Sequence, residues 1–465
     1  MGPRLALTDG MTHLPALSAD LVRRYDVAAP RYTSYPTAPM WTDRFGRHDY
    51  ALALAHAAAR DAPLSLYVHI PFCRKMCSYC GCNVIITKDG ARCEPYLKAL
   101  DGEAGLVAEQ LGPRRRLSRV HLGGGTPTTL TEAQLVTLWR TITDRFTIER
   151  DAELAVEIDP MVTSSEQLAL LRGMGFNRLS MGVQDFDPEV QHAVNRVQSI
   201  EDTRATLDYA RAIGFKSVNF DLIYGLPLQT PESWRRTLLA VAEMRPDRVS
   251  LFSFAYVPEL KPHQRRLPAA HLPLGMDKLT LFRAGHDTLV DAGYRAIGLD
   301  HFALPDDDLA RAADDGRLWR DFQGYTVERA PDTIALGTSA IGQVGGAFVQ
   351  NTRLLPAYQS AIRDGRLPIE RGHWLTDDDR RRAAIITDLM CNGKVDLGAD
   401  ACDFALELGE LRAQERDGLL VIDGGRITLS AIGRVLVRNV AAVFDAYLRR
   451  DVVSDRERPR YSRTV

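Results

Sequence analysis

The sequence has no uninterrupted apolar run of about eighteen residues, the length that a membrane-spanning helix requires, so it predicts no membrane span. It also has almost no net charge, −2 over 465 residues, which excludes a general attraction to nucleic acid or to an anionic membrane. Residues 1–6 lack the compact apolar segment of a secretion signal. We therefore expect a cytoplasmic protein that has neither nucleic acid nor a membrane among its partners.

Cysteine is rare, with seven residues in the chain, yet Cys73, Cys77, Cys80 and Cys82 stand close together. An odd number of cysteines gathered in one loop does not fit the disulfide framework of a secreted protein and fits a reducing compartment. The first three have the spacing C-x3-C-x2-C. Structural zinc commonly takes four ligands in two distant pairs, and no second pair is evident in the sequence.

Three thiolates in one compact loop suit three corners of a [4Fe–4S] cluster, because such clusters are held by cysteine thiolates. The fourth iron then has no protein ligand and can bind a small molecule. Cys82 is too close to Cys80 to be needed as a further corner, so we expect it to be structural or to tune electron transfer. The competing interpretation is a group of core cysteines without a metal.

Strand-like and helix-like stretches alternate from residue 61 onward. The expected strands are 64–70, 119–122, 154–158, 178–181, 217–223 and 248–254. The expected helices are 94–111, 132–146, 165–173, 190–213 with an internal break, and 233–243. Such βα repetition predicts a parallel sheet with helices outside it. Six units are too few for a closed eight-stranded barrel.

The strand Tyr67-Val-His-Ile-Pro-Phe-Cys73, followed by the cysteine loop, resembles the radical S-adenosylmethionine (SAM) superfamily. The addition of Gly81-Cys82-Asn83, together with the segment P-R-Y-T-S-Y-P-T at 30–37, resembles the oxygen-independent coproporphyrinogen III oxidases within it. The resemblance implies an α/β fold with a partial (β/α)6 barrel. It also implies an N-terminal arm over the active site (1–60), the barrel with substrate-side segments (61–365) and a mostly helical C-terminal domain (366–465).

The same resemblance implies the reaction. SAM bound to the open iron of the [4Fe–4S] cluster yields a 5′-deoxyadenosyl radical, and coproporphyrinogen III is oxidatively decarboxylated to protoporphyrinogen IX in haem biosynthesis. The implied cofactors are the cluster and SAM, with two SAM molecules expected. The implied partners are coproporphyrinogen III and a low-potential electron donor, and we expect a monomer.

The resemblance also assigns the cofactor site. The expected cluster ligands are Cys73, Cys77 and Cys80. The residues expected to bind SAM are Tyr67, Tyr79, Gly124, Gly125, Thr126, Glu157, Gln184, Arg196, Asp221, Ala255 and Ile341. Glycines let a ligand approach the backbone, and acids within apolar strands must be paired or face a polar cleft. The alternatives are a buried ion pair for Glu157 with a lysine or arginine, and a hydrogen-bonded network at the barrel mouth for Gln184, Arg196 and Asp221.

Three residues are predicted to act on the substrate side: Tyr67, Arg31 and His301. Arg31 lies between prolines in the segment 30–37, which should be extended, and its guanidinium suits a substrate carboxylate. His301 follows Asp300, with which it equally fits a structural hydrogen-bonded pair. Tyr67 is placed to pack near the cluster or the substrate, and core packing is its alternative.

The last hundred residues change character. A helix is expected from Thr376 through 383–391, then a hairpin over 418–429, a long amphipathic helix over 430–448 and a mobile tail over 449–465. Helix, hairpin and helix resemble a winged-helix module. Because its basic residues are interspersed with acids, a cap over the barrel is favoured over DNA binding.

Two other functions share the cluster loop: a radical SAM methyltransferase or ring-opening enzyme acting on haem, and a haem chaperone relative. Deoxyadenosine without a methylated product would argue against the methyltransferase. The chaperone relatives lack both the cysteine at the position of Cys82 and the segment at 30–37, and this sequence has both.

Overall fold

The computed structural model describes residues 12–327, 329–453 and 461–464, so residues 1–11 of the expected arm lie outside the described part. Its centre is a twelve-stranded sheet in which six parallel strands follow chain order. These are β1 (Leu64–Ile70), β4 (Arg116–Gly124), β5 (Thr147–Ile158), β6 (Arg178–Gln184), β7 (Ser217–Tyr224) and β8 (Arg248–Ser253). Within the described residues the sheet ends at β16 and β9 without closing, which confirms the predicted partial barrel.

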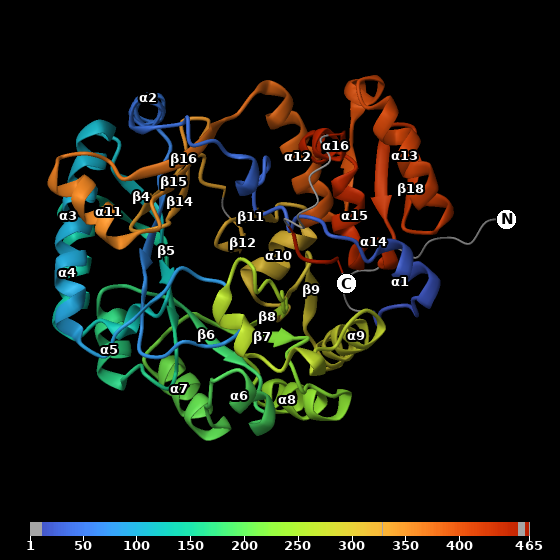
Figure 1. Cartoon of the computed structure of the whole chain (residues 1–465), viewed down its shortest axis with the longest axis horizontal. Helices are drawn as coiled ribbons and strands as arrows, with labels where there is room; N and C mark the ends of the chain where they lie inside the picture. Colours follow the sequence, from blue (N-terminus) through green and yellow to red (C-terminus); the bar gives the residue numbers. More distant parts are fainter. Residues whose placement is uncertain (1–11, 328, 454–460, 465) are drawn as a thin grey trace.

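Helices cover the outer face of these strands in an arc (Figure 1). They are α3 (Glu94–Leu111), α4 (Glu132–Thr143), α5 (Ser165–Gly173), α6 (Pro188–Ala193), α7 (Ile200–Ala212) and α8 (Pro231–Met244). Thr131 and Ser164 begin α4 and α5 as capping boxes. The predicted helix over 190–213 breaks between α6 and α7, as expected. No helix in the described ranges is both long and apolar enough to cross a bilayer.

Short strands that the sequence did not reveal extend the sheet at both edges. β13 (Thr333–Leu336) pairs parallel to β1, and β14 (Ile341–Val344), β15 (Ala347–Asn351) and β16 (Ile369–Trp374) follow antiparallel. β10 (His301–Ala303) and β9 (Arg295–Ile297) continue from β8. Because β16 pairs with β15, the boundary predicted at 366 is wrong, and the sheet continues to Trp374.

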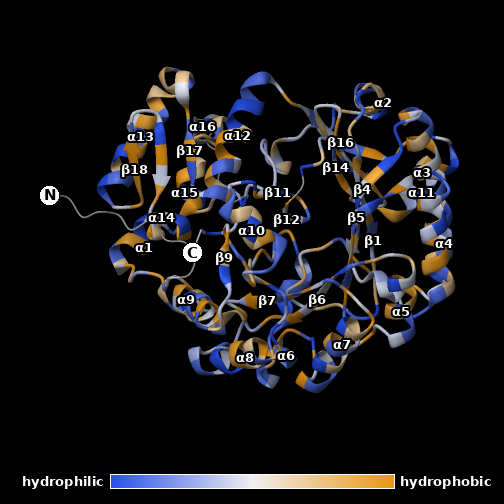
Figure 2. Ribbon diagram, turned by 180° about the vertical axis from the view of Figure 1, so that it is seen from behind, coloured by the Kyte–Doolittle hydropathy of each residue, from blue (hydrophilic) through white to orange (hydrophobic). Residues whose placement is uncertain are grey.

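The other α-helices and strands of the first 365 residues lie around this sheet, except the first of them, which packs with the C-terminal region. They are α1 (Ala19–Tyr25), α2 (Arg47–Ala58), β2 (Phe72–Cys73), β3 (Ile85–Ile86), α9 (Met276–Asp291), α10 (Asp308–Asp314), β11 (Trp319–Asp321), β12 (Gly324–Thr326) and α11 (Leu355–Arg363). Figure 2 shows that the helices around the sheet carry both hydrophobic and hydrophilic residues. This is the pattern of helices that bury one face and expose the other.

The two faces of the parallel strands differ in chemistry. Side chains alternate between the faces of a strand, and the outward set, such as Leu66, Val120 and Val156, is buried beneath the helices. The inward set is polar: Tyr67, Arg119, His121, Glu153, Glu157, Ser180, Asn219, Asp221 and Ser250. The sequence therefore builds an apolar core outside the sheet and a polar interior within its curve.

The C-terminal region contains α12 (Asp377–Asn392), β17 (Lys394–Asp396), α13 (Ala405–Arg416), β18 (Leu420–Asp423) and β19 (Arg426–Leu429). The predicted hairpin is confirmed, with Asp423 opposite Arg426. The predicted single helix over 430–448 is wrong: it is α14 (Ala431–Val435), α15 (Val437–Ala442) and α16 (Ala446–Val453). Asp445 starts α16 by accepting hydrogen bonds from the N–H groups of Tyr447 and Leu448.

The end of the chain lies against the N-terminal arm. Ala29 N–H donates to Ser462 O at 3.2 Å, and Thr464 N–H donates to Val27 O at 2.8 Å. The predicted mobile tail is therefore wrong for 462–464, and residues 454–460 lie outside the described part. The segment 30–37 is not helical, as predicted, but it bends over 33–36 instead of running extended, and Tyr32 has a φ of 47°.

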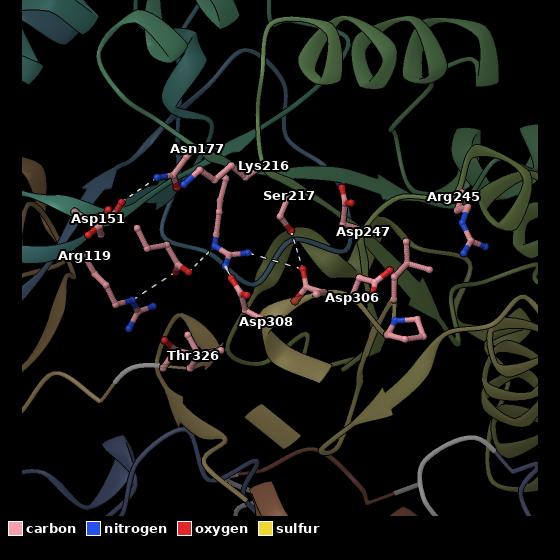
Figure 3. A pocket seen from close by; sticks show the side chains of 17 residues that line it. Arg119, Asp151, Asn177, Lys216, Ser217, Arg245, Asp247, Asp306, Asp308 and Thr326 are labelled. Atoms are coloured by element: carbon pink, nitrogen blue, oxygen red, sulfur yellow. Dashed lines mark hydrogen bonds and ion pairs between the residues drawn. The ribbon is translucent and has the colours of Figure 1, made fainter. Parts of the chain in front are cut away.

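A charged cavity of about 480 Å³ lies at the N-terminal ends of the strands (Figure 3). Arg178, the first residue of β6, pairs with Glu153 at 2.5 Å and with Asp308 at 3.0 Å. Arg248, the first residue of β8, pairs with Asp307 at 2.8 Å. These ion pairs connect Glu153 of β5 and the N-terminal ends of β6 and β8 to the start of α10.

Replacing Arg178 by methionine is expected to lower the free energy of unfolding by about 3 kcal/mol, because Glu153 then loses a partly buried cation. Chemical denaturation measures this change. Arg311 is the matched control: it is 61% exposed and pairs with Asp308 at 3.7 Å, so its methionine variant should lose under about 0.5 kcal/mol. Equal losses in the two variants would contradict a stabilising role for this cluster.

Candidate active site

The cysteine loop follows β1 at the C-terminal edge of the sheet. Cys73 lies on β2, which pairs with β3, and Cys73, Cys77, Cys80 and Cys82 line one cavity of about 280 Å³. Most of the predicted SAM-binding residues line the same cavity: Tyr79, Gly124, Gly125, Thr126, Glu157, Gln184, Arg196 and Asp221. The structure thus brings together residues from the ends of β4, β5, β6 and β7, where ligands bind in such folds.

The arrangement of the cysteines fits a cluster better than a single ion. Among the described residues, no three His, Cys, Asp or Glu side chains stand close enough to hold one metal ion. The three predicted ligands line one shared cavity, and three thiolates in one cavity suit three irons of a cubane. The residues present therefore fit a [4Fe–4S] cluster.

Each predicted cluster ligand has a hydrogen-bonding group beside its sulfur. Thr126 Oγ1 lies 3.5 Å from Cys73 Sγ, Arg196 Nη1 donates to Cys77 Sγ at 3.8 Å, and Cys82 N–H donates to Cys80 Sγ at 3.4 Å. Hydrogen bonds to the sulfurs help to set the reduction potential of a cluster. The backbone N–H of Cys82 thus binds the sulfur of Cys80, the neighbouring predicted ligand.

Side chains far along the sequence hold the backbone of this loop. His263 Nε2 donates to Cys80 O at 2.7 Å, Gln264 Nε2 donates to Tyr79 O at 3.2 Å, and Lys261 Nζ donates to Cys82 O at 3.2 Å. None of these three residues was predicted from the sequence. They bind main-chain carbonyl groups, so no sequence motif marks them. The one indication in the sequence is that they follow β8, whose end faces the same side of the sheet as the cysteine loop.

The glycine run at the end of β4 is required by close contacts. A Cβ on Gly125 would lie 2.7 Å from Phe72 O and 2.9 Å from Ile70 O, both of them backbone atoms. A Cβ on Gly124, whose φ is 114°, would lie 2.5 Å from the ring of His69. The run therefore packs against the strand that carries Cys73 and also borders the cavity.

A Gly125→Ala variant is expected to be less stable by about 1–3 kcal/mol and to lose iron, because the added methyl group must displace β2. Thermal unfolding and iron content measure the two effects. Gly81→Ala is the control in the same loop, since no heavy atom lies within 4 Å of its added Cβ. If both variants kept the iron content of the wild-type protein, the packing argument would be wrong.

Glu157 is a charged group that faces the cavity. Its carboxylate accepts hydrogen bonds from His121 Nε2 at 3.0 Å and from Gly124 N–H at 2.9 Å. Burial would raise the pKa of Glu157, but the bonds from His121 and Gly124 outweigh it and keep the pKa below its usual value. Within the described part of the chain Glu157 pairs with no lysine or arginine, which was the alternative, and 39% of its side chain is exposed.

Asp221 and Arg196 each have protein partners and also border the cavity. Asp221 accepts hydrogen bonds from Ser180 Oγ at 3.0 Å and Asn219 Nδ2 at 2.8 Å, and burial raises its pKa. Arg196 pairs with Asp159 at 3.0 Å and donates to a backbone carbonyl at 2.6 Å. A hydrogen-bonded network therefore exists at the barrel mouth, and it faces the cysteine cavity.

Three predicted SAM-binding residues do not line this cavity. Tyr67 is hydrogen-bonded to His69 Nδ1 at 3.1 Å inside the barrel. Ala255 lies beside the loop, because Gln264 Nε2 donates to its carbonyl as well as to that of Tyr79. Ile341 lines a separate cavity of about 170 Å³, together with the arm residues 32–35.

Arg31 and His301 meet at one buried carboxylate. Asp300 is 4% exposed, forms an ion pair with Arg31, and lies 2.7 Å from His301 Nδ1 and 3.6 Å from Arg320. Burial opposes its ionisation, but the two arginines and the histidine keep the pKa of Asp300 well below its usual range. The structural pair expected as the alternative for His301 is present, and Arg31 is engaged by the protein itself.

Comparison with known proteins identifies the family. The model of the Radical SAM superfamily matches residues 67–241. The oxygen-independent coproporphyrinogen III oxidase of Pseudomonas aeruginosa is 43% identical, covering 96% of this chain and 98% of its own length. The enzyme of Escherichia coli K12 is also 43% identical, over 92% of this chain and 95% of its own.

A solved structure of coproporphyrinogen III oxidase from Escherichia coli, described as a radical SAM enzyme, superimposes with a TM-score of 0.88 and 42% identity. The superposition covers 94% of this chain and 100% of the chain in the solved structure. These matches extend over the arm, the sheet and the C-terminal region, well beyond the segment shared by the whole superfamily. The chain belongs to the oxygen-independent coproporphyrinogen III oxidases, the radical SAM enzymes that act in haem biosynthesis.

Proposed function

We propose that Cys73, Cys77 and Cys80 hold the [4Fe–4S] cluster and that the cavity that these cysteines line would also bind SAM at the fourth iron. The gathering of the three cysteines and most of the expected SAM residues around one cavity supports this assignment. Bound there, the cluster and SAM supply the 5′-deoxyadenosyl radical that removes hydrogen from a substrate propionate. Loss of CO2 from that propionate leaves one electron, which passes to an electron acceptor that the reaction also requires, and two such decarboxylations convert coproporphyrinogen III to protoporphyrinogen IX.

The residues around the cavity bind and orient the cofactor. The carboxylates of Glu157 and Asp221 face it and suit the ammonium and ribose hydroxyl groups of SAM. The edge of Gly124, Gly125 and Thr126 lets the methionine part approach the backbone. Tyr79 offers an aromatic face to a cationic ligand.

A second SAM molecule is proposed on the side of Ile341. Ile341 lines its own cavity, bounded by the arm residues 32–35, by β11 and by α12. This cavity is distinct from the one that the cysteines line, so the protein offers two spaces. We further propose that the arm and the C-terminal domain together cover the substrate above the barrel.

The electron donor is proposed to approach over the segment that holds the cysteine loop. Lys261 contacts the carbonyl of Cys82, Arg265 and Arg266 are exposed, and Leu260 is 67% exposed. A segment with exposed arginines and an exposed leucine suits an acidic electron-transfer protein. We propose that the enzyme itself acts as a monomer in the cytoplasm.

One assay tests the proposed function. Anaerobic protein with a reconstituted cluster is given coproporphyrinogen III, SAM and a reductant, and the products are identified by mass spectrometry. The expected result is loss of two CO2 per tetrapyrrole with one deoxyadenosine per CO2, and equilibrium dialysis should count two SAM molecules per chain. A methylated tetrapyrrole, or binding without decarboxylation, would support the methyltransferase or chaperone instead.

A further inference from the structure

Two cations are buried in the interior beneath the arm without an ion pair among the described residues. Arg438 on α15 is 4% exposed and Lys278 on α9 is 9% exposed. Lys278 Nζ donates to Phe254 O at 2.9 Å, and burial, with the nearby guanidinium groups of Arg438 and Arg31, lowers its pKa to about 8. Buried charges are normally paired. The acids that act on these two cations, Asp26 and Asp300, each form an ion pair with another arginine, Arg463 and Arg31, so cations outnumber anions here.

A small recess adjoins these cations. It has a volume of about 30 Å³ and is lined by Arg31, Arg438, Tyr224, Ser253 and Asp300 together with apolar side chains. That volume suits a single water molecule or a carboxylate group. Its one acid, Asp300, is already bound by Arg31, Arg320 and His301, so the recess keeps an excess of positive charge.

Arg438 also joins the two chain termini at this place. Its guanidinium donates to the carbonyls of Ala29, Pro30 at 3.1 Å, Ser462 at 2.9 Å and Arg463 at 2.8 Å. Carbonyl oxygens satisfy its N–H groups, but they carry no net charge that would neutralise it. The arm and the end of the chain therefore close around a cationic recess.

The recess lies within reach of the cysteine cavity. Tyr224 ends β7 three residues after Asp221, which borders that cavity. At about 3.3 Å per residue the two backbone positions are about 10 Å apart along the strand, but because side chains alternate, Tyr224 points to the opposite face of β7 from Asp221, toward Phe282. Arg31 lies over the ring of Phe252, 5.7 Å from its centre, near the end of β8. A tetrapyrrole with four propionates can span this distance.

We propose that this recess binds one propionate carboxylate of the substrate, and so places a different propionate over the cysteine cavity. Arg438 and Arg31 line the recess and supply the positive charge, and the hydroxyl groups of Tyr224 and Ser253 line it as well. Lys278 lies outside the lining and adds its charge through its proximity to both arginines. The inference rests on the proposed function, because it takes the substrate to be a tetracarboxylic tetrapyrrole. It adds the C-terminal domain to the substrate site.

The test measures the affinity of the anaerobic holoenzyme for coproporphyrin III, a fluorescent tetracarboxylate, by fluorescence titration. Lys278→Met and Arg438→Met should each raise Kd by at least about tenfold, since each removes a charge from a charge-assisted site. Arg438→Lys keeps the charge but cannot hold four carbonyls, and its Kd should stay within about threefold of the wild-type value. Arg434→Met is the matched control on α14, because Arg434 lies against Gly393 and should not affect Kd.

Comparing the variants separates the effect of the positive charge of Arg438 from the effect of its hydrogen bonds to the two ends of the chain. If Arg438→Lys bound coproporphyrin III as weakly as Arg438→Met, only the hydrogen bonds of Arg438 to the chain ends would matter, and the proposal would be wrong. An unchanged Kd for Lys278→Met would also overturn it. Iron content and near-ultraviolet circular dichroism report whether each variant is folded, and Lys278→Met decides if Arg438→Met is not. A wild-type enzyme that neither binds nor decarboxylates its substrate would instead defeat the proposed function.

Discussion

Replacing Cys77 by serine is expected to remove the cluster and to lower the rate of deoxyadenosine formation by at least about a thousandfold. The reason is that the cluster has three protein ligands and none in reserve, and a serine hydroxyl is a much weaker iron ligand than a thiolate. Iron and sulfide analysis, visible absorption and chromatography of deoxyadenosine measure the loss. The same outcome is expected for Cys73 and Cys80.

The matched control is Cys402→Ser. Cys402 is exposed and lies in the C-terminal region beside Ala399 O, away from the cavity that the other cysteines line. This variant should retain the iron and the rate of the wild-type enzyme. A Cys77→Ser protein that kept both a full complement of iron and SAM cleavage would show that Cys77 is not a ligand.

The second large effect is expected at Glu157. A Glu157→Gln variant should bind SAM about 10- to 100-fold more weakly, because hydrogen bonds to a charged group contribute roughly 1.5–3 kcal/mol. The carboxylate of Glu157 accepts one hydrogen bond at each oxygen, from His121 and from Gly124 N–H. The glutamine amide has only one accepting oxygen and can replace only one of these two contacts. Anaerobic equilibrium dialysis with labelled SAM measures the affinity.

Glu166→Gln is the control, because Glu166 lies exposed in the first turn of α5 and should leave the affinity unchanged. Iron content separates a direct effect from a damaged loop. If Glu157→Gln kept a full cluster and bound SAM as tightly as the wild-type enzyme, Glu157 would be a structural residue that only positions His121 and the glycine run.

The sequence predicted the six parallel strands and their helices well, since each βα unit has a continuous apolar strand and a marked helix start such as Thr131 or Ser164. The short strands β9, β10 and β13–β16 were missed. They contain three to six residues each, and turns join several of them, so no periodicity develops. The two breaks in 430–448 were also missed: one lies at Leu436, and the other precedes α16, where the side chain of Asp445 caps the new helix.

The site residues could be predicted where a motif stands at the end of a strand. They could not be predicted where the contacting residues are far apart in the sequence. Cys77, Glu157 and Asp221 meet because parallel strands end at one edge. Arg31, in contrast, meets Asp300 from 269 positions away, and His263 contacts only a backbone carbonyl. Neither contact leaves a pattern in the local sequence.

The account depends most on a cluster with one open iron. The direct measurement is iron content and electron paramagnetic resonance of the anaerobically reconstituted, reduced protein, before and after addition of SAM. We predict about four irons per chain and a clear change in the cluster signal when SAM binds. A colourless protein, zinc in place of iron, or a signal that SAM leaves unchanged would contradict the account.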